Sequence, residues 1–179
     1  MRVWAVANQK GGVGKTTSTV SLGGLLAEQG HKVLLIDLDP HGSLTSYFGY
    51  DPDSLSASSY QLFQGDANKR ADDVLSLVSG TSVPGLSIMP TSPALATVER
   101  QMTGKDGMGL RVNKALQSID GTFDYVLLDC PPVLGVLMIN ALAACEKLIV
   151  PVQTEFLALK GLERMTRTMQ MVQKARPQP

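Results

Sequence analysis

One glycine-rich segment combines residue types and a spacing that suit the binding of phosphate groups. It covers residues 10–17 and reads Lys10, Gly11, Gly12, Val13, Gly14, Lys15, Thr16 and Thr17. Glycines let the backbone curl so that successive N–H groups point at one anion, and a helix that begins there adds its positive end. Lys15 can then reach the β- and γ-phosphates of a nucleotide, the Thr16 hydroxyl can ligate Mg²⁺, and Thr17 lies within reach of the α-phosphate. The segment therefore predicts a site for a nucleoside triphosphate with Mg²⁺.

The residues on either side of this segment predict a strand before it and a helix after it. The run from Val3 to Ala7 is apolar, and small and apolar residues alternate from Thr16 to Gln29, where Gly30 is a suitable helix stop. A strand, a glycine loop and a helix in this order are the context that a phosphate-binding loop requires. A glycine-rich turn without a ligand is the alternative, and the agreement of spacing, residue types and flanking elements counts against it.

Three aspartates follow two further apolar runs. Asp37 and Asp39 end the run that begins at Val33, and Asp129 ends the run that begins at Tyr125. In an open α/β sheet, ligands bind beyond the carboxyl ends of the strands, so we expect these side chains to converge on the glycine-rich loop. A magnesium–phosphate site needs carboxylates around the ion and a group that orients the attacking water. Aspartates that only form turns are the alternative interpretation.

The order of apolar runs and helical patterns predicts an α/β fold with a mostly parallel, twisted sheet flanked by helices. The expected strands are residues 3–7, 33–36, 86–89, 125–128 and 148–152. The expected helices are residues 16–29, 59–63, 71–78, 94–101, 110–119, 137–144 and 157–174. Because the strands are almost continuously hydrophobic, we expect helices on both faces of the sheet. Residues 103–109 are expected to form a flexible loop.

Composition suits one domain with a core of its own. The chain has 179 residues, 44% of them hydrophobic, and its formal net charge is zero. From Phe156 onward there are five basic residues against one acidic residue, so this part could contact nucleic acid or an acidic partner. An ordinary solvated helix face is the alternative. Apolar residues at helical spacing between Leu157 and Val172 are interpreted as a face that packs on the sheet.

The sequence also bears on compartment and on metal binding. It shows no signal-peptide pattern and no apolar stretch long enough to span a bilayer. Cys130 and Cys145 lack the spacing of a metal site. We therefore expect both cysteines to be small core residues. The expected compartment is the cytoplasm.

The glycine-rich segment departs from the general phosphate-loop pattern. The first glycine of G-x-x-x-x-G-K-[ST] would stand at Gln9, and instead Lys10 precedes a Gly-Gly pair. This K-G-G-x-G-K-[ST] form resembles the deviant Walker A loop of the ParA/MinD family of ATPases. The D-x-D-P run that starts at Asp37, and the strand that ends in Asp129 before two prolines, are also similar to that family. The resemblance covers the whole chain, more weakly across residues 54–123, and implies a P-loop NTPase fold of the SIMIBI type.

The resemblance implies a role for each polar residue of the site. Lys10 would reach across a dimer interface to the phosphates of the ATP that the other subunit holds, as an arginine finger does. Asp39 would position the hydrolytic water, and Asp37 would support Mg²⁺ and the loop. Asp129 would accept hydrogen bonds from Mg²⁺-bound water or from the Thr16 hydroxyl. Together these residues would form one half of a shared ATPase site.

Carried over to this chain, the resemblance implies a cytoplasmic ATPase, nucleoid-associated or polar, that positions or segregates cargo. ATP would clamp two copies into a homodimer, the dimer would bind DNA without sequence preference, and a partner protein would stimulate slow hydrolysis. Residues 40–49 and 160–165 are most similar to the subgroup that positions chemotaxis arrays. A MinD-like ATPase that acts at a membrane is the alternative. A redox ATPase similar to the nitrogenase iron protein is a third hypothesis, which needs two cysteines at the dimer axis.

Two features depart from the family's pattern. His41 stands where the family more often has glutamine; a histidine can titrate near neutral pH, and a tolerated polar substitute is the alternative. Family chains also continue for several dozen residues beyond the length of this one. Their further part supplies another strand, the segment that grips adenine, and basic residues that bind DNA. We expect residues 1–179 to form a single ATPase domain that lacks this C-terminal portion.

Overall fold

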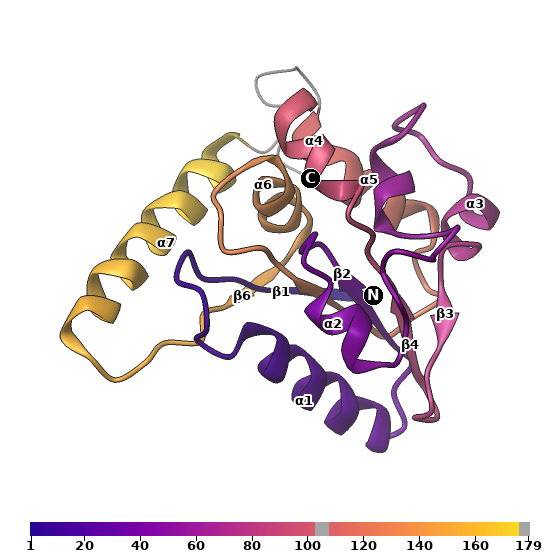
Figure 1. Ribbon diagram of the computed structural model, residues 1–179, viewed down its shortest axis with the longest axis horizontal. Helices are drawn as coiled ribbons and strands as arrows, with labels where there is room; N and C mark the ends of the chain where they lie inside the picture. The colour runs from indigo at the N-terminus through magenta and orange to yellow at the C-terminus, as the bar shows by residue number, and fades with distance from the viewer. Residues whose placement is uncertain (103–107, 176–179) are drawn as a thin grey trace.

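The computed structural model describes residues 1–102 and 108–175, which form a central sheet with helices on both sides (Figure 1). The strands within these residues lie in the spatial order β3-β4-β2-β5-β1-β6. Their bounds are β1 Arg2–Val6, β2 Val33–Asp37, β3 Ser79–Gly80, β4 Leu86–Met89, β5 Tyr125–Asp129 and β6 Lys147–Ile149. Every neighbouring pair is parallel except β3 and β4, which confirms the predicted, mostly parallel sheet.

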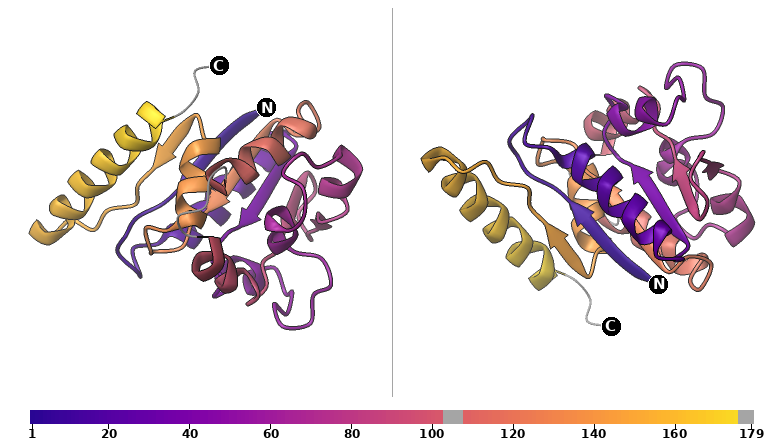
Figure 2. Two further views of the ribbon diagram at one scale, coloured as in Figure 1. Left: turned by 90° about the horizontal axis from the view of Figure 1, so that it is seen from above. Right: turned by 90° about the horizontal axis from the view of Figure 1, so that it is seen from below.

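Helices connect these strands and cover the two faces of the sheet. Their bounds are α1 Lys15–Glu28, α2 Ser43–Tyr47, α3 Ala71–Leu75, α4 Leu95–Met102, α5 Arg111–Ser118, α6 Val136–Ala144 and α7 Phe156–Ala175, with 3₁₀ turns η1 Ser59–Phe63 and η2 Met108–Leu110. Helix α1 lies against one face, and α4, α5 and α6 lie over the other (Figure 1). Helix α7 lies on the side of the molecule that β6 borders, away from β3 (Figure 2). Among the described helices, none is both long and apolar enough to cross a membrane.

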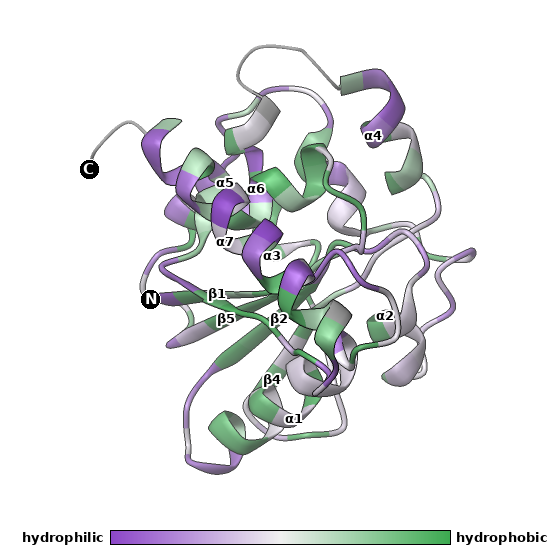
Figure 3. Ribbon diagram, turned by 90° about the vertical axis from the view of Figure 1, so that its left-hand side faces the viewer, coloured by the Kyte–Doolittle hydropathy of each residue, from purple (hydrophilic) through white to green (hydrophobic). Residues whose placement is uncertain are grey.

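Strand β2 shows why the sequence of this sheet reads as continuous apolar runs. Leu34 and Ile36 belong to the core cluster that includes residues of α5 and α6, whereas Val33 and Leu35 belong to the cluster on the α1 side. Successive side chains of a strand point to opposite faces, and here both faces are covered, so every residue of β2 is buried. The strands accordingly carry the hydrophobic colours in Figure 3.

Most predicted elements are confirmed to within one or two residues, and a few differ. Strand β6 ends at Ile149 and not at residue 152, since Pro151 lacks the N–H that would continue the ladder. Helix α3 ends at Leu75 instead of residue 78, and neither α2 nor the two-residue strand β3 was expected. Of the loop predicted at residues 103–109, residues 103–107 lie outside the described residues, and residues 108–109 belong to the 3₁₀ turn η2. The two cysteines are buried, as predicted.

The ends of three neighbouring strands bring the predicted polar residues to one edge of the sheet. In the ladders Val6 pairs with Asp129, and Asp37 pairs with Asp129 from the other side. The glycine-rich loop follows β1 directly, so it lies beside the residues that follow β2 and β5. The convergence expected from the parallel topology is therefore present.

Candidate functional site

The loop between β1 and α1 has a backbone shape that requires glycine at two positions. Gly12 and Gly14 have φ angles of 71° and 87°, a left-handed conformation that residues with side chains rarely adopt. A Cβ on either residue would meet nothing within 4 Å, so there is room for a side chain at both positions. Glycine is required there because of the backbone conformation. Gly14 is the N-cap of α1 and makes no side-chain cap bond, and the first turn of α1 contains no acidic residue. The N–H groups at this helix end are therefore free to bind an anion.

Lys15 begins α1, and its side chain folds back over the loop. The residue is only 8% exposed, and its Nζ donates to the carbonyl oxygen of Lys10 at 3.3 Å. This bond is long for an ammonium donor, and the other donors of the group stay available. The charge of Lys15 is thus held where phosphate oxygens would lie against the loop.

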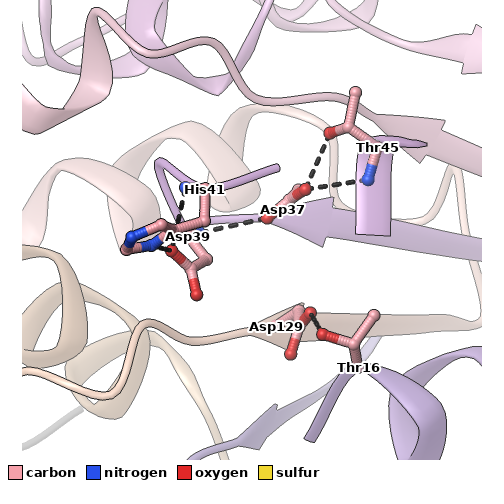
Figure 4. A network of polar contacts seen from close by, with 6 residues as sticks. All are labelled: Thr16, Asp37, Asp39, His41, Thr45 and Asp129. Atoms are coloured by element: carbon pink, nitrogen blue, oxygen red, sulfur yellow. Dashed lines mark hydrogen bonds and ion pairs between the residues drawn. The ribbon is translucent and has the colours of Figure 1, made fainter. Parts of the chain in front are cut away.

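Thr16 connects the loop to the end of β5. Its Oγ1 donates to Oδ2 of Asp129 at 2.7 Å (Figure 4). Thr19 lies one turn further along α1, and its hydroxyl is 3.5 Å from Oδ1 of the same carboxylate. The Thr16–Asp129 contact is one that the sequence led us to expect, whereas Thr19 was missed. Its spacing of three residues from Thr16, on the same helix face, is the signal that could have found it.

Asp37 holds the loop that follows β2. It is fully buried, and its Oδ2 accepts hydrogen bonds from the backbone N and the Oγ1 of Thr45 at 2.9 and 2.7 Å. Its Oδ1 accepts from the backbone N of Asp39 at 3.0 Å. The carboxylate thus ties the start of the loop to α2 (Figure 4). Thr45 was not predicted, because no motif links it to an aspartate eight residues earlier.

Asp39 lies at the mouth of the site. Its Oδ1 accepts a hydrogen bond from the backbone N of His41 at 3.0 Å and lies 2.8 Å from Nδ1 of the same histidine. Its side chain is 16% exposed, and that of His41 is 81% exposed. Asp39 is therefore a carboxylate held on a short turn, with one oxygen engaged by His41.

These elements surround a cleft of about 520 Å³, within the range of small-molecule sites. Its lining consists of Gly11, Gly12, Gly14, Lys15, Thr16, Thr17, Asp39, His41, Ser43 and Pro132. Of the predicted site residues, Asp37 and Asp129 are buried and do not line the cleft, nor do Val13 and Lys10. Pro132, one of the two prolines that follow Asp129, also lines it, and so does Ser43, which no sequence pattern had indicated. One wall of the cleft is the glycine loop, and Asp39 and His41 come from the chain after β2.

Known proteins match the chain over almost its full length. A protein-family model described as an AAA domain matches residues 1–178. Sporulation initiation inhibitor protein Soj of Bacillus subtilis is 39% identical over 173 residues, and chromosome partitioning protein ParA of Caulobacter vibrioides is 40% identical over 174 residues. The chain belongs to the ParA/MinD family of ATPases. The resemblance predicted from the glycine loop is thereby confirmed.

The ParA/MinD relatives are longer than this chain. The matches cover 97% and 96% of this chain but only 66% of Soj and 63% of ParA. A solved structure of cobyrinic acid a,c-diamide synthase from Mycobacterium smegmatis, with a bound ATP analogue and magnesium, has a TM-score of 0.88 to this chain at 43% identity. That match covers 97% of this chain and 69% of the other. The chain thus spans about two thirds of the length of the relatives it matches.

The early lysine that marks the ParA/MinD loop is bound within its own chain. Nζ of Lys10 donates to Oε1 of Gln153 at 2.8 Å and forms an ion pair with Glu155. Both partners lie in the segment between β6 and α7. The side chains of Lys10 and Glu155 are 44% and 48% exposed, so water screens the pair and its net contribution to stability is small. Lys10 can therefore exchange Glu155 for another anion at little cost.

Burial raises the pKa of both carboxyl groups at the strand ends. The pKa of Asp37 rises to about 7 and that of Asp129 to about 6, chiefly because burial penalises the charged form. Hydrogen bonds from Thr45 and Thr16 oppose the rise, and a neighbouring carboxylate adds to it in each case. A cation beside these groups would favour their charged forms. Since Mg²⁺ in nucleotide sites takes most of its ligands from phosphate and water, a Thr16 hydroxyl backed by Asp129 fits this ion.

The raised pKa values predict that the ligand-free protein becomes less stable as the pH rises from about 4 to about 7. In the unfolded chain both carboxyl groups ionise near pH 4, whereas in the folded chain they keep protons up to about pH 6 and 7. The folded state binds more protons in this window, so the free energy of unfolding falls with pH. Urea unfolding of wild type and Asp129→Asn, whose amide is neutral at every pH, measures the effect. The stability of the variant relative to wild type should increase across the window; a constant difference would contradict the raised pKa of Asp129.

Proposed function

We propose that this chain binds Mg·ATP in the cleft between the glycine loop and Asp39 and hydrolyses it slowly. The observation that carries the proposal is the position of three different groups around one cleft. Lys15 lies over the loop, Thr16 is bonded to Asp129 at 2.7 Å, and Asp39 lines the same space. The similar structure with a bound ATP analogue and magnesium supports this assignment.

Each group has a distinct task in this proposal. The N–H groups of the loop and Nζ of Lys15 bind the phosphates, with the exposed Thr17 hydroxyl near the α-phosphate. Thr16 would hold Mg²⁺, with Asp129 and Asp37 behind it, and the ion would neutralise charge at the phosphate oxygens. Asp39 accepts a hydrogen bond from the attacking water and orients it toward the γ-phosphate. Catalysis then depends on positioning and on charge, as in other phosphoryl transfers.

We further propose that ATP converts the chain into a homodimer in which Lys10 contacts the partner's ATP. Within one chain the ammonium of Lys10 is paired with the exposed carboxylate of Glu155. To exchange this carboxylate for the phosphates bound by the other copy would cost little free energy. ATP would then stabilise the paired state, and hydrolysis would release it, so the nucleotide shifts an equilibrium between two states. A stimulating partner protein would set the lifetime of the pair.

Lys10→Ala is expected to bind ATP within a few-fold of wild type but to remain monomeric with ATP. Lys15 and the loop N–H groups hold the phosphates within one chain, whereas Lys10 would act across the interface. Light scattering with size exclusion, with and without Mg·ATP, measures the effect beside titration calorimetry. Lys32→Ala is the control, since Lys32 is an exposed lysine just before β2, at the opposite end of that strand from the cleft. An ATP-dependent dimer of Lys10→Ala would contradict the role across the interface.

The cargo-positioning role rests on relatives named for chromosome partitioning and on the charge of α7. Four basic residues of α7 are exposed against one acidic residue: Lys160, Arg164, Arg167 and Lys174 against Glu163. Such a surface suits DNA without sequence preference, and the affinity should fall steeply with salt. We propose a cytoplasmic, nucleoid-associated or polar ATPase that positions DNA or a protein assembly such as a chemotaxis array. Electrophoretic mobility shifts with Mg·ATP at two salt concentrations test the DNA contact.

One observation favours the MinD-like alternative. Among the apolar residues at helical spacing on α7, which were expected to pack on the sheet, Met165 is buried but Leu159 is 56% exposed. Phe156 and Met171 of the same helix are 75% and 61% exposed. Exposed apolar residues beside basic ones on one helix suit a membrane surface. Sedimentation with anionic liposomes and Mg·ATP distinguishes the two functions. Binding to liposomes without binding to DNA would favour the MinD-like function.

A further inference from the structure

The turn after β2 brings the ring of His41 onto the carboxylate of Asp39. Gly42 has a φ of 69°, and a Cβ there would lie 2.7 Å from Cγ of Pro52, so both the backbone conformation and the available space require glycine in this turn. The backbone N of Gly42 also donates to the carbonyl oxygen of Asp39 at 3.0 Å. The turn therefore fixes the backbone of His41 relative to Asp39, and the ring reaches back to the carboxylate.

The two oxygens of Asp39 have different surroundings. Oδ1 accepts the backbone N–H of His41 and lies 2.8 Å from Nδ1 of its ring. Within residues 1–102 and 108–175, no hydrogen bond to Oδ2 is formed. Figure 4 shows this second oxygen pointing away from the ring of His41 and toward the side of Asp129 and Thr16. The arrangement engages one oxygen and presents the other to the cleft.

We propose that His41 is a positioning residue for hydrolysis, which it serves by donating a hydrogen bond from Nδ1–H to Oδ1 of Asp39. This inference rests on the proposed function, in which Asp39 orients the attacking water. With Oδ1 held by two donors, the side chain keeps the rotamer that turns Oδ2 toward the water. A backbone N–H alone leaves the carboxylate free to rotate, and the loss of orientation lowers the rate of the chemical step. His41 also lines the cleft, as Asp39 does.

Because His41 is exposed, its contribution to the rate of hydrolysis can be measured separately from its contribution to the stability of the fold. Because 81% of its side chain is exposed, the ring buries little area, and its replacement should leave the thermal midpoint nearly unchanged. The shape-matched pair His41→Asn and His41→Leu tests the donor itself. Both side chains branch at Cγ as histidine does, and asparagine places an N–H where Nδ1 lies, whereas leucine places a methyl group there.

Steady-state hydrolysis of Mg·ATP by the full chain is the first measurement. We expect His41→Leu to lower kcat about 10-fold with KM unchanged, and His41→Asn to recover most of the wild-type kcat. In the double variant Asp39→Ala/His41→Leu, the loss should equal that of Asp39→Ala alone, since His41 acts through Asp39. Equal kcat for His41→Asn and His41→Leu, or a change in KM alone, would overturn the inference.

A second measurement does not depend on turnover. A long-range ¹H–¹⁵N spectrum of the neutral ring should show the Nδ1–H tautomer in wild type and the Nε2–H tautomer in Asp39→Ala. An Nε2–H tautomer in wild type would overturn the inference. The two proposals fail separately. If Asp39→Ala hydrolyses ATP at the wild-type rate, Asp39 does not orient the water and the proposed function fails at this residue. If Asp39→Ala is slow but His41→Leu hydrolyses ATP at the wild-type rate, only the proposal for His41 fails.

Discussion

Replacement of Lys15 by alanine is expected to abolish ATP binding at micromolar protein concentrations. The ammonium is almost buried over the glycine loop, and the one hydrogen bond described for it is 3.3 Å long and goes to the backbone of Lys10. Its charge is therefore available to two phosphate groups at once. Hydrogen bonds to charged groups contribute about 1.5–3 kcal/mol each, so the loss of this group should weaken binding by about 100-fold or more. Titration calorimetry with Mg·ATP measures the change.

Two controls separate this effect from damage to the fold. Lys32→Ala removes an exposed lysine before β2 and should leave the affinity for ATP unchanged. Circular dichroism of Lys15→Ala should show the wild-type helix content, because alanine has the highest helix propensity and Lys15 begins α1. A folded Lys15→Ala protein with the wild-type affinity for ATP would show that the glycine loop does not bind phosphates.

The part of this site that could be predicted from sequence is encoded by short-range spacing or by the alignment of parallel strands. The glycine loop and Lys15 are consecutive in the chain, so their geometry follows from a local backbone shape. Asp37 and Asp129 could be placed beside the loop because parallel strands align their carboxyl ends, and continuous apolar runs identified those strands. The same runs predicted the core, since the central strands β2 and β5 are buried along almost their whole length.

The contacts that could not be predicted involve segments that leave no pattern of their own in the sequence. Thr45 binds Asp37 from a five-residue helix too short to leave a hydrophobic period, and Glu155 binds Lys10 across 145 residues. The two-residue strand β3 depends wholly on its pairing with β4. No local propensity encodes these contacts, and each depends on the packing of the finished fold. The bond between Asp39 and His41 is local, but its geometry follows from the left-handed turn at Gly42.

Asp39→Ala is expected to bind ATP with nearly the wild-type affinity and to hydrolyse it about 100-fold more slowly. The phosphates would be held by the loop and Lys15, which the substitution does not touch. The water would lose the acceptor that orients it, and the removal of one positioned catalytic group costs about two to four orders of magnitude in rate. Because hydrolysis would release the dimer, the variant should accumulate in the ATP-bound pair. Single-turnover hydrolysis and light scattering with Mg·ATP measure both consequences.

The controls for Asp39 distinguish loss of the carboxylate from loss of the turn. Asp39→Asn keeps an acceptor for the backbone N–H of His41 and should retain the shape of the loop, yet it carries no charge to polarise the water. Asp53→Ala removes an exposed aspartate from the segment after α2 and should hydrolyse ATP at the wild-type rate. If Asp39→Asn is slow and fully folded, the charge of the carboxylate is what the chemistry requires. If Asp39→Asn and Asp39→Ala both turn over as wild type does, another group orients the water, and the cleft would then be a nucleotide-binding site without this catalytic residue.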